Sequence, residues 1–141
     1  MPQLLALDYG RKRTGIAVTD DSQIIASGLT TVRTHDLFDF LKDYFAKHEV
    51  VTIVLGDPKR MDGSATDSTK EVAGLKKRLL KTFDIPVAMV DERFTSKMAF
   101  QTMIDMGLSK KKRQNKELVD EISATIILQS YMSQRDNQLG R

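Results

Sequence analysis

The chain has 141 residues, of which 40% are hydrophobic and 29% are charged, a balance typical of one globular domain. It contains no cysteine, which excludes disulfide bonds and thiolate metal sites. It also lacks an apolar run near the roughly 18 residues of a spanning helix and an N-terminal signal-peptide pattern. We therefore expect a cytoplasmic protein without a membrane partner.

The N-terminal part of the chain predicts three strands joined by short links. Residues 4–7 form a continuous apolar run, as in a strand buried on both faces. Further strands are predicted at 14–19 and 24–32, and the short links favour an antiparallel meander.

Helices and strands then alternate. Helices are predicted at 36–48, with Asp36 as the cap, at 68–83, at 95–106 and at 118–134, and strands at 50–55 and 87–90. The order βββαβαβα predicts an α/β fold: a mixed five-stranded sheet, with a three-strand antiparallel meander plus two parallel strands, flanked by helices. We expect one domain over residues 1–141, with a polar, frayed tail at 135–141.

Acidic residues follow two of the buried strands. The first strand ends at Asp8 and the fifth at Asp91 and Glu92. Ligands of open α/β sheets bind outside the carboxyl ends of the strands. If the first, fourth and fifth strands are parallel neighbours, Asp8 approaches Asp91 and Glu92 at one edge of the sheet.

Asp120 is a third candidate because of its place on the last helix. The stripe Ala124, Ile127 and Tyr131 is small and then apolar, which indicates that this face of the helix packs on the sheet. Asp120 would then join the strand carboxylates. The alternative is that Asp120 only complements the dipole at the helix N-terminus.

Three neighbouring carboxylates repel one another unless a proton or a cation lies between them. A ligand set made only of oxygen favours Mg²⁺ or Mn²⁺, and two such ions can activate water for phosphodiester cleavage. We predict Asp8, Glu92 and Asp120 as metal ligands and catalytic residues. Adjacent strand residues face opposite ways, so the sequence leaves open whether Asp91 or Glu92 points inward. We favour Glu92 for its longer side chain and keep Asp91 as an additional candidate.

The basic residues form clusters that could bind the phosphates of a nucleic acid, although the net charge is only +3. A solvated surface explains any single cluster equally well. Arg13 lies in a segment, 10–15, that has the glycine spacing of a P-loop but carries Ile16 in place of its lysine; we expect a hairpin there. The candidate contacts are Arg11, Lys12, Arg13, Lys59, Arg60, Arg93, Lys110, Lys111, Lys112 and Arg113.

Four segments in order, at 7–18, 54–58 with 61–63, 91–96 and 119–124, resemble the YqgF family, also called RuvX-like or pre-16S rRNA nucleases. The resemblance implies an RNase H-like fold related to Holliday junction resolvases. It also implies a cytoplasmic bacterial nuclease that processes the 5′ end of 16S rRNA precursor, with Asp8, Asp91 or Glu92, and Asp120 as its acidic residues. Asp57 departs from the family pattern, where an apolar residue is common; its carboxylate could join the metal site or weaken the approach of phosphate.

Three alternatives stay open. The substrate could be a DNA four-way junction, in which case symmetric cutting of two strands favours a homodimer over a monomer. The pattern Asp8-x-Gly10 also occurs in the phosphate loop of actin-like ATPases and sugar kinases, but those need two lobes and this chain supplies one. A non-catalytic nucleic-acid-binding module is the third alternative, and fold alone does not exclude it.

Overall fold

A computed structural model describes residues 2–57, 67–91 and 115–138 of the chain. The helix predicted at 95–106 lies outside these residues. In the described part, the elements follow the predicted order, and no helix there is long and apolar enough to cross a membrane.

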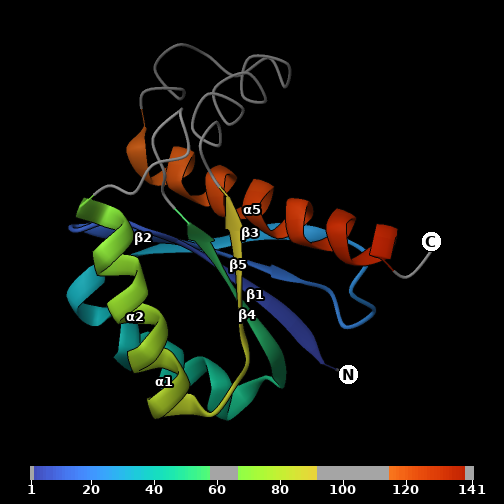
Figure 1. The fold of residues 1–141 in the computed structure, drawn as a ribbon, viewed down its shortest axis with the longest axis horizontal. Helices are drawn as coiled ribbons and strands as arrows, with labels where there is room; N and C mark the ends of the chain where they lie inside the picture. Colours follow the sequence, from blue (N-terminus) through green and yellow to red (C-terminus); the bar gives the residue numbers. More distant parts are fainter. Residues whose placement is uncertain (1, 58–66, 92–114, 139–141) are drawn as a thin grey trace.

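Five strands form one sheet in the order β3-β2-β1-β4-β5 (Figure 1). β1 pairs antiparallel with β2 and parallel with β4, and β5 is parallel to β4. The predicted mixed sheet is therefore confirmed, with β1 at its centre. The strands are β1 (Gln3–Tyr9), β2 (Arg13–Thr19), β3 (Ala26–Arg33), β4 (Val50–Asp57) and β5 (Val87–Asp91).

Helices cover both faces of the sheet (Figure 1). Helices α1 (Leu37–Lys47) and α2 (Asp67–Phe83) lie on one face, and α5 (Lys116–Gln138) lies on the other. Helix α5 continues beyond the predicted end at residue 134, and its Arg135 donates a hydrogen bond from Nη1 to Oε1 of Gln23 at 2.6 Å. That contact ties the end of α5 to the β2–β3 connection.

The start of α1 differs from the prediction. A 3₁₀ turn, η1 (Thr34–Asp36), precedes the helix, and Asp36 already has a helical backbone with φ −95° and ψ −1°. Its side chain makes no capping hydrogen bond. Asp36 therefore holds the predicted N-cap position of α1 but does not cap the helix with its side chain, because a capping side chain needs an extended backbone at that position.

The two hydrophobic cores decide which way the residues of β1 point. Leu5 and Leu7 are fully buried in the core beneath α1 and α2, whereas Leu4 and Ala6 are buried beneath α5. Burial of each leucine contributes about 1.5–3 kcal/mol. Because side chains alternate along a strand, the next residue, Asp8, lies on the α5 side of the sheet. Tyr9 lies on the α1 and α2 side, where it packs against the first core.

Candidate active site

Asp8 lies at the carboxyl end of β1, on the face covered by α5, and its side chain is partly exposed. In the antiparallel pairing of β1 with β2, the residue directly opposite Asp8 is Gly15. The Cβ positions of such opposed residues are about 5 Å apart. Whatever packs on Gly15 is therefore a close neighbour of Asp8.

The residue that packs on Gly15 is Asp120 of α5. A Cβ atom placed on Gly15 would lie 2.2 Å from the backbone oxygen of Asp120 and 3.0 Å from its Cβ. Only a residue without a side chain allows the helix to come this close to the strand. Gly15 thus seats the first turns of α5 on the sheet, with Asp120 packed on the register partner of Asp8.

The stripe predicted to hold α5 on the sheet is confirmed. Ala124 and Ile127 are buried in the core beneath the helix, and Tyr131 packs against the same core. Sequence reasoning missed the part played by Gly15, which we placed in the second strand and related only to the tight hairpin. The signal was a glycine inside a strand, which often marks a place where another backbone approaches.

Asp120 forms an ion pair across this face. Nε of Arg13 donates a hydrogen bond to Oδ2 of Asp120 at 2.9 Å, and the side chains are 35% and 22% exposed, respectively. Arg13 lies two residues before Gly15 on β2. Residues two positions apart on a strand lie on the same face of the sheet, so Arg13 and Gly15 share the face covered by α5. The predicted phosphate contact thus lies directly beside a predicted catalytic carboxylate.

The first turns of α5 form a negative region. The pKa of Glu121 is raised, first by burial and then by the negative charges of Glu117 and Asp120. Arg13 compensates part of this charge.

Two further carboxylates belong to the other side of the sheet. Asp57 and Asp91 are register partners at the ends of β4 and β5. Leu55 and Met89, two residues earlier, contact the core beneath α1 and α2. Because side chains alternate along a strand, Asp57 and Asp91 lie on the face covered by α1 and α2, opposite to the face of Asp8.

The remaining predicted residues lie outside the described part of the chain. No group of three or more His, Asp or Glu placed to hold a metal occurs within 2–57, 67–91 and 115–138. The predicted site residues that lie outside the described part are Glu92, Lys59, Arg60, Arg93, Lys110, Lys111, Lys112 and Arg113.

The β1–β2 turn carries a basic cleft of about 410 Å³, which is lined by Arg11, Lys12, Arg13, Arg33 and His35. Thr34 fixes this turn to η1: its hydroxyl donates to the carbonyl of Gly10 at 2.5 Å, and its N–H donates to that of Lys12 at 3.0 Å. Sequence reasoning missed Arg33 and His35, since only the fold brings the end of β3 beside this turn.

Comparison with known proteins identifies relatives over nearly the whole chain. Residues 2–134 match the family model described as "RuvX: Holliday junction resolvase". A protein of Flavobacterium johnsoniae, named "Putative pre-16S rRNA nuclease", is 61% identical over 96% of this chain and 99% of its own length. A protein of Flavobacterium psychrophilum with the same name is 56% identical over the same shares.

The fold has a solved counterpart at low sequence identity. T. thermophilus RuvC, solved in complex with a Holliday junction substrate, superposes with a TM-score of 0.55 and is 13% identical, covering 96% of both chains. This likeness concerns the fold alone and supports the predicted RNase H-like architecture. The match to the family model and the two close relatives together show that the chain belongs to the RuvX family.

Proposed function

We propose that this protein is a divalent-metal-dependent endonuclease that matures the 5′ end of 16S rRNA precursor in the cytoplasm. The observation that supports the proposal is the contact of Asp120 of α5 with Gly15, the register partner of Asp8. The names of the 61% and 56% identical relatives support precursor rRNA as the substrate.

The side chains at this face suit a hard divalent cation. Asp8 and Asp120 supply carboxylate oxygens, which Mg²⁺ and Mn²⁺ prefer. We propose Glu92 as the third ligand in preference to Asp91, since Asp91 belongs to the opposite face. Bound ions would supply a water of lowered pKa and charge stabilisation for the leaving oxygen.

Basic residues around the β1–β2 turn would hold the strand. Arg11, Lys12 and Arg33 line the cleft next to the candidate site, where they can contact phosphates flanking the cut. Arg13 would exchange its bond to Asp120 for a phosphate when a cation takes over the charge of that carboxylate. The basic residues outside the described part are proposed as further phosphate contacts.

Holliday junction cleavage is a second candidate. It is favoured by the description of the matching family model. Cutting two strands symmetrically would need a second active site, and hence a homodimer. Light scattering of the free protein and of its junction complex distinguishes this arrangement from a monomer acting on RNA.

The test is cleavage of a precursor 16S rRNA fragment and of a four-way DNA junction, with Mg²⁺ or Mn²⁺ and with EDTA. We expect metal-dependent cutting of the RNA that Asp8→Asn lowers at least a hundredfold while RNA binding persists. Asp39→Asn, an exposed carboxylate on α1, is the matched control and should cut normally. Cutting of the junction alone supports the second candidate, and cutting of neither substrate overturns the enzyme proposal.

A further inference from the structure

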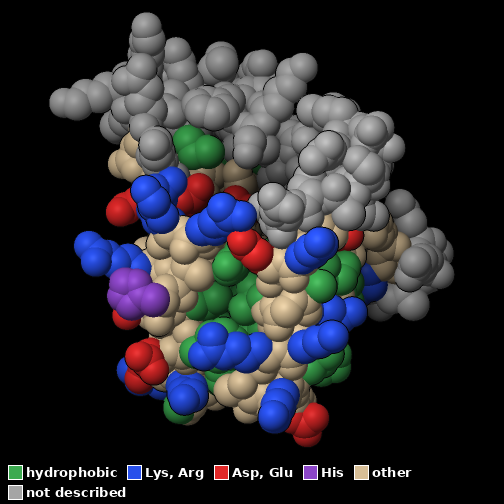
Figure 2. All heavy atoms as spheres, turned by 60° about the vertical axis from the view of Figure 1, so that its left-hand side comes forward, with side chains coloured by type: hydrophobic (Ala, Val, Ile, Leu, Met, Phe, Trp, Pro, Cys, Tyr) green, Lys and Arg blue, Asp and Glu red, His purple; other side chains and the backbone are tan. Residues whose placement is uncertain are grey.

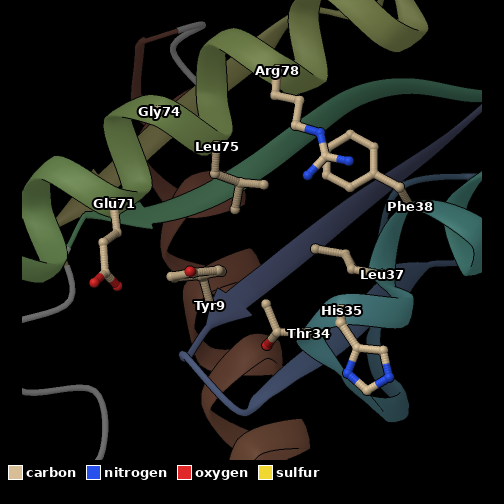
Figure 3. Close-up of a pocket in the computed structure, with 9 residues that line it drawn as sticks. All are labelled: Tyr9, Thr34, His35, Leu37, Phe38, Glu71, Gly74, Leu75 and Arg78. Atoms are coloured by element: carbon tan, nitrogen blue, oxygen red, sulfur yellow. The ribbon is translucent and has the colours of Figure 1, made fainter.

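The basic cleft is built from two short segments that the sheet brings together. One segment, residues 11–13, forms the β1–β2 turn and the start of β2, and the other, residues 33–35, ends β3 and begins η1. Five of these six residues line the cleft, and the sixth is Thr34. Figure 3 shows Thr34 between Tyr9, at the end of β1, and His35. Thr34 therefore lies where the two segments meet.

Thr34 holds the β1–β2 turn at three alternate positions. Its N–H donates to the carbonyl of Lys12 at 3.0 Å, and its hydroxyl donates to the carbonyl of Gly10. Because this bond uses the hydroxyl proton, the Thr34 oxygen accepts a second bond, at 3.0 Å, from the hydroxyl of the buried Thr14. The turn is tight, since a Cβ atom on Gly10 would lie 2.6 Å from the carbonyl oxygen of Arg13. One residue thus fixes the backbone that carries the cations of the turn.

The positive charge of the cleft is only partly compensated. Arg13 and Arg33 are register partners on β2 and β3, and like charges directly opposite each other are destabilising. Arg11 and Arg13 each pair with a carboxylate, at 2.8 and 2.9 Å, respectively. Within the described part of the chain, Lys12 and Arg33 form no ion pair, and no acidic residue lines the cleft. A phosphate group, which accepts hydrogen bonds from several cationic side chains at once, matches this surplus.

We propose that Thr34 is a positioning residue for nucleic-acid binding, which presets the cations of both segments around one phosphate group of the bound strand. The identity of that strand rests on the proposed function, whereas the hydrogen bonds of Thr34 do not. Thr34 does not line the cleft, so it acts through the backbone of the turn. A turn that is fixed in advance does not have to be ordered by the ligand, which strengthens binding. Figure 2 shows Lys and Arg side chains on the side of the molecule where α1 and α2 lie, so the strand would meet further cations there.

The test is fluorescence anisotropy in EDTA with a labelled RNA decamer of uridine. Thr34→Val removes the bonds to Gly10 and Thr14 and should bind about five- to tenfold more weakly, since the loosened turn must then be ordered on binding. Thr34→Ser keeps the hydroxyl and should bind like the wild type. In Thr34→Val, the slope of log Kd against log salt concentration should become shallower by about 0.7, the contribution of one phosphate contact on a single strand.

Thr19→Val is the matched control, because it makes the same change at the far end of β2. The Thr19 hydroxyl accepts the N–H of Leu4 at 2.9 Å, and both residues are buried. Thr19→Val should therefore lose stability but bind the decamer normally, which separates a loss of stability from a loss of positioning. Urea denaturation verifies that each variant is folded in the assay. If Thr34→Val does not fold, Gly10→Ala, whose Cβ would force the same turn open, takes its place with the same expected loss.

Single-turnover cleavage adds a second readout. Thr34→Val should need more RNA for half-saturation but reach the wild-type rate, because none of the hydrogen bonds of Thr34 involves Asp8 or Asp120.

Unchanged RNA affinity and salt slope in Thr34→Val, or an equal loss of affinity in Thr19→Val, overturns the role of Thr34 and leaves the proposed function standing. The expected differences in binding without any cleavage support the role of Thr34 and count against the proposed function alone. A wild-type protein that does not bind the decamer overturns both.

Discussion

Replacing Gly15 by alanine tests the contact that brings α5 to the sheet. The added methyl group would lie 2.2 Å from the oxygen and 2.5 Å from the carbon of the Asp120 carbonyl, whereas carbon atoms in contact are about 3.5–4.0 Å apart. Both obstructing atoms belong to the backbone, so α5 must move by about 1 Å or β2 must bend. Overpacking of this kind costs about 1–3 kcal/mol, and we expect the upper end because the shift disturbs the core beneath α5.

The control is Gly74→Ala in the middle of α2, where a Cβ would meet nothing within 4 Å. Alanine there should stabilise the protein by about 0.5–1 kcal/mol through helix propensity. Urea denaturation measures both effects, and Gly15→Ala should also cut the RNA more slowly at temperatures where it is folded. A Gly15→Ala protein as stable as the wild type would show that α5 does not pack closely on Gly15.

Three further predictions concern side-chain contacts. Asp120→Asn should lower the rate of cleavage at least a hundredfold, measured by single-turnover cleavage. The free energy of unfolding, measured by urea denaturation, should change by only about 1 kcal/mol or less, since a partly exposed ion pair contributes little. Thr34→Val should destabilise the protein by about 1–2 kcal/mol. The substitution removes the hydrogen bond to Gly10 and the hydroxyl partner of the buried Thr14, which lies 3.0 Å from it. A change in the free energy of unfolding below about 0.5 kcal/mol, the low end for one hydrogen bond, would contradict this prediction. Burial raises the pKa of Tyr44, whose hydroxyl donates to Gln3 at 2.7 Å. The unfolded chain therefore releases this proton first, and wild-type stability should fall more steeply than that of Tyr44→Phe as the pH rises above 10.0, the ordinary pKa of tyrosine. Parallel pH profiles would contradict the assignment.

The strands and most helices could be predicted because each leaves a local pattern. The run ending at Leu7 has no polar residue to place in water, which indicates a central strand, and the stripe through Ala124 and Ile127 has the period of a helix. Asp8 and Asp120 became candidates in the same way, from their positions at the ends of such elements.

The contacts between these elements could not be predicted, because they join residues far apart in the chain. The ion pair of Arg13 with Asp120 spans 107 positions, and that of Arg11 with Glu71 spans 60. Glu71 follows Ser68 by three residues, a spacing typical of a helix-capping pair, yet its Oε1 pairs with Arg11. A local sequence pattern predicts the helix or strand on which an acidic residue lies. Its ion-pair partner depends on which distant segment the fold places next to it.

The most direct test is the anomalous diffraction of a crystal soaked in manganese. We expect a manganese ion bound to carboxylate oxygens of both Asp8 and Asp120, with Arg13 released from Asp120. A map without manganese at these two residues, or with manganese bound elsewhere while Arg13 stays paired with Asp120, would contradict it.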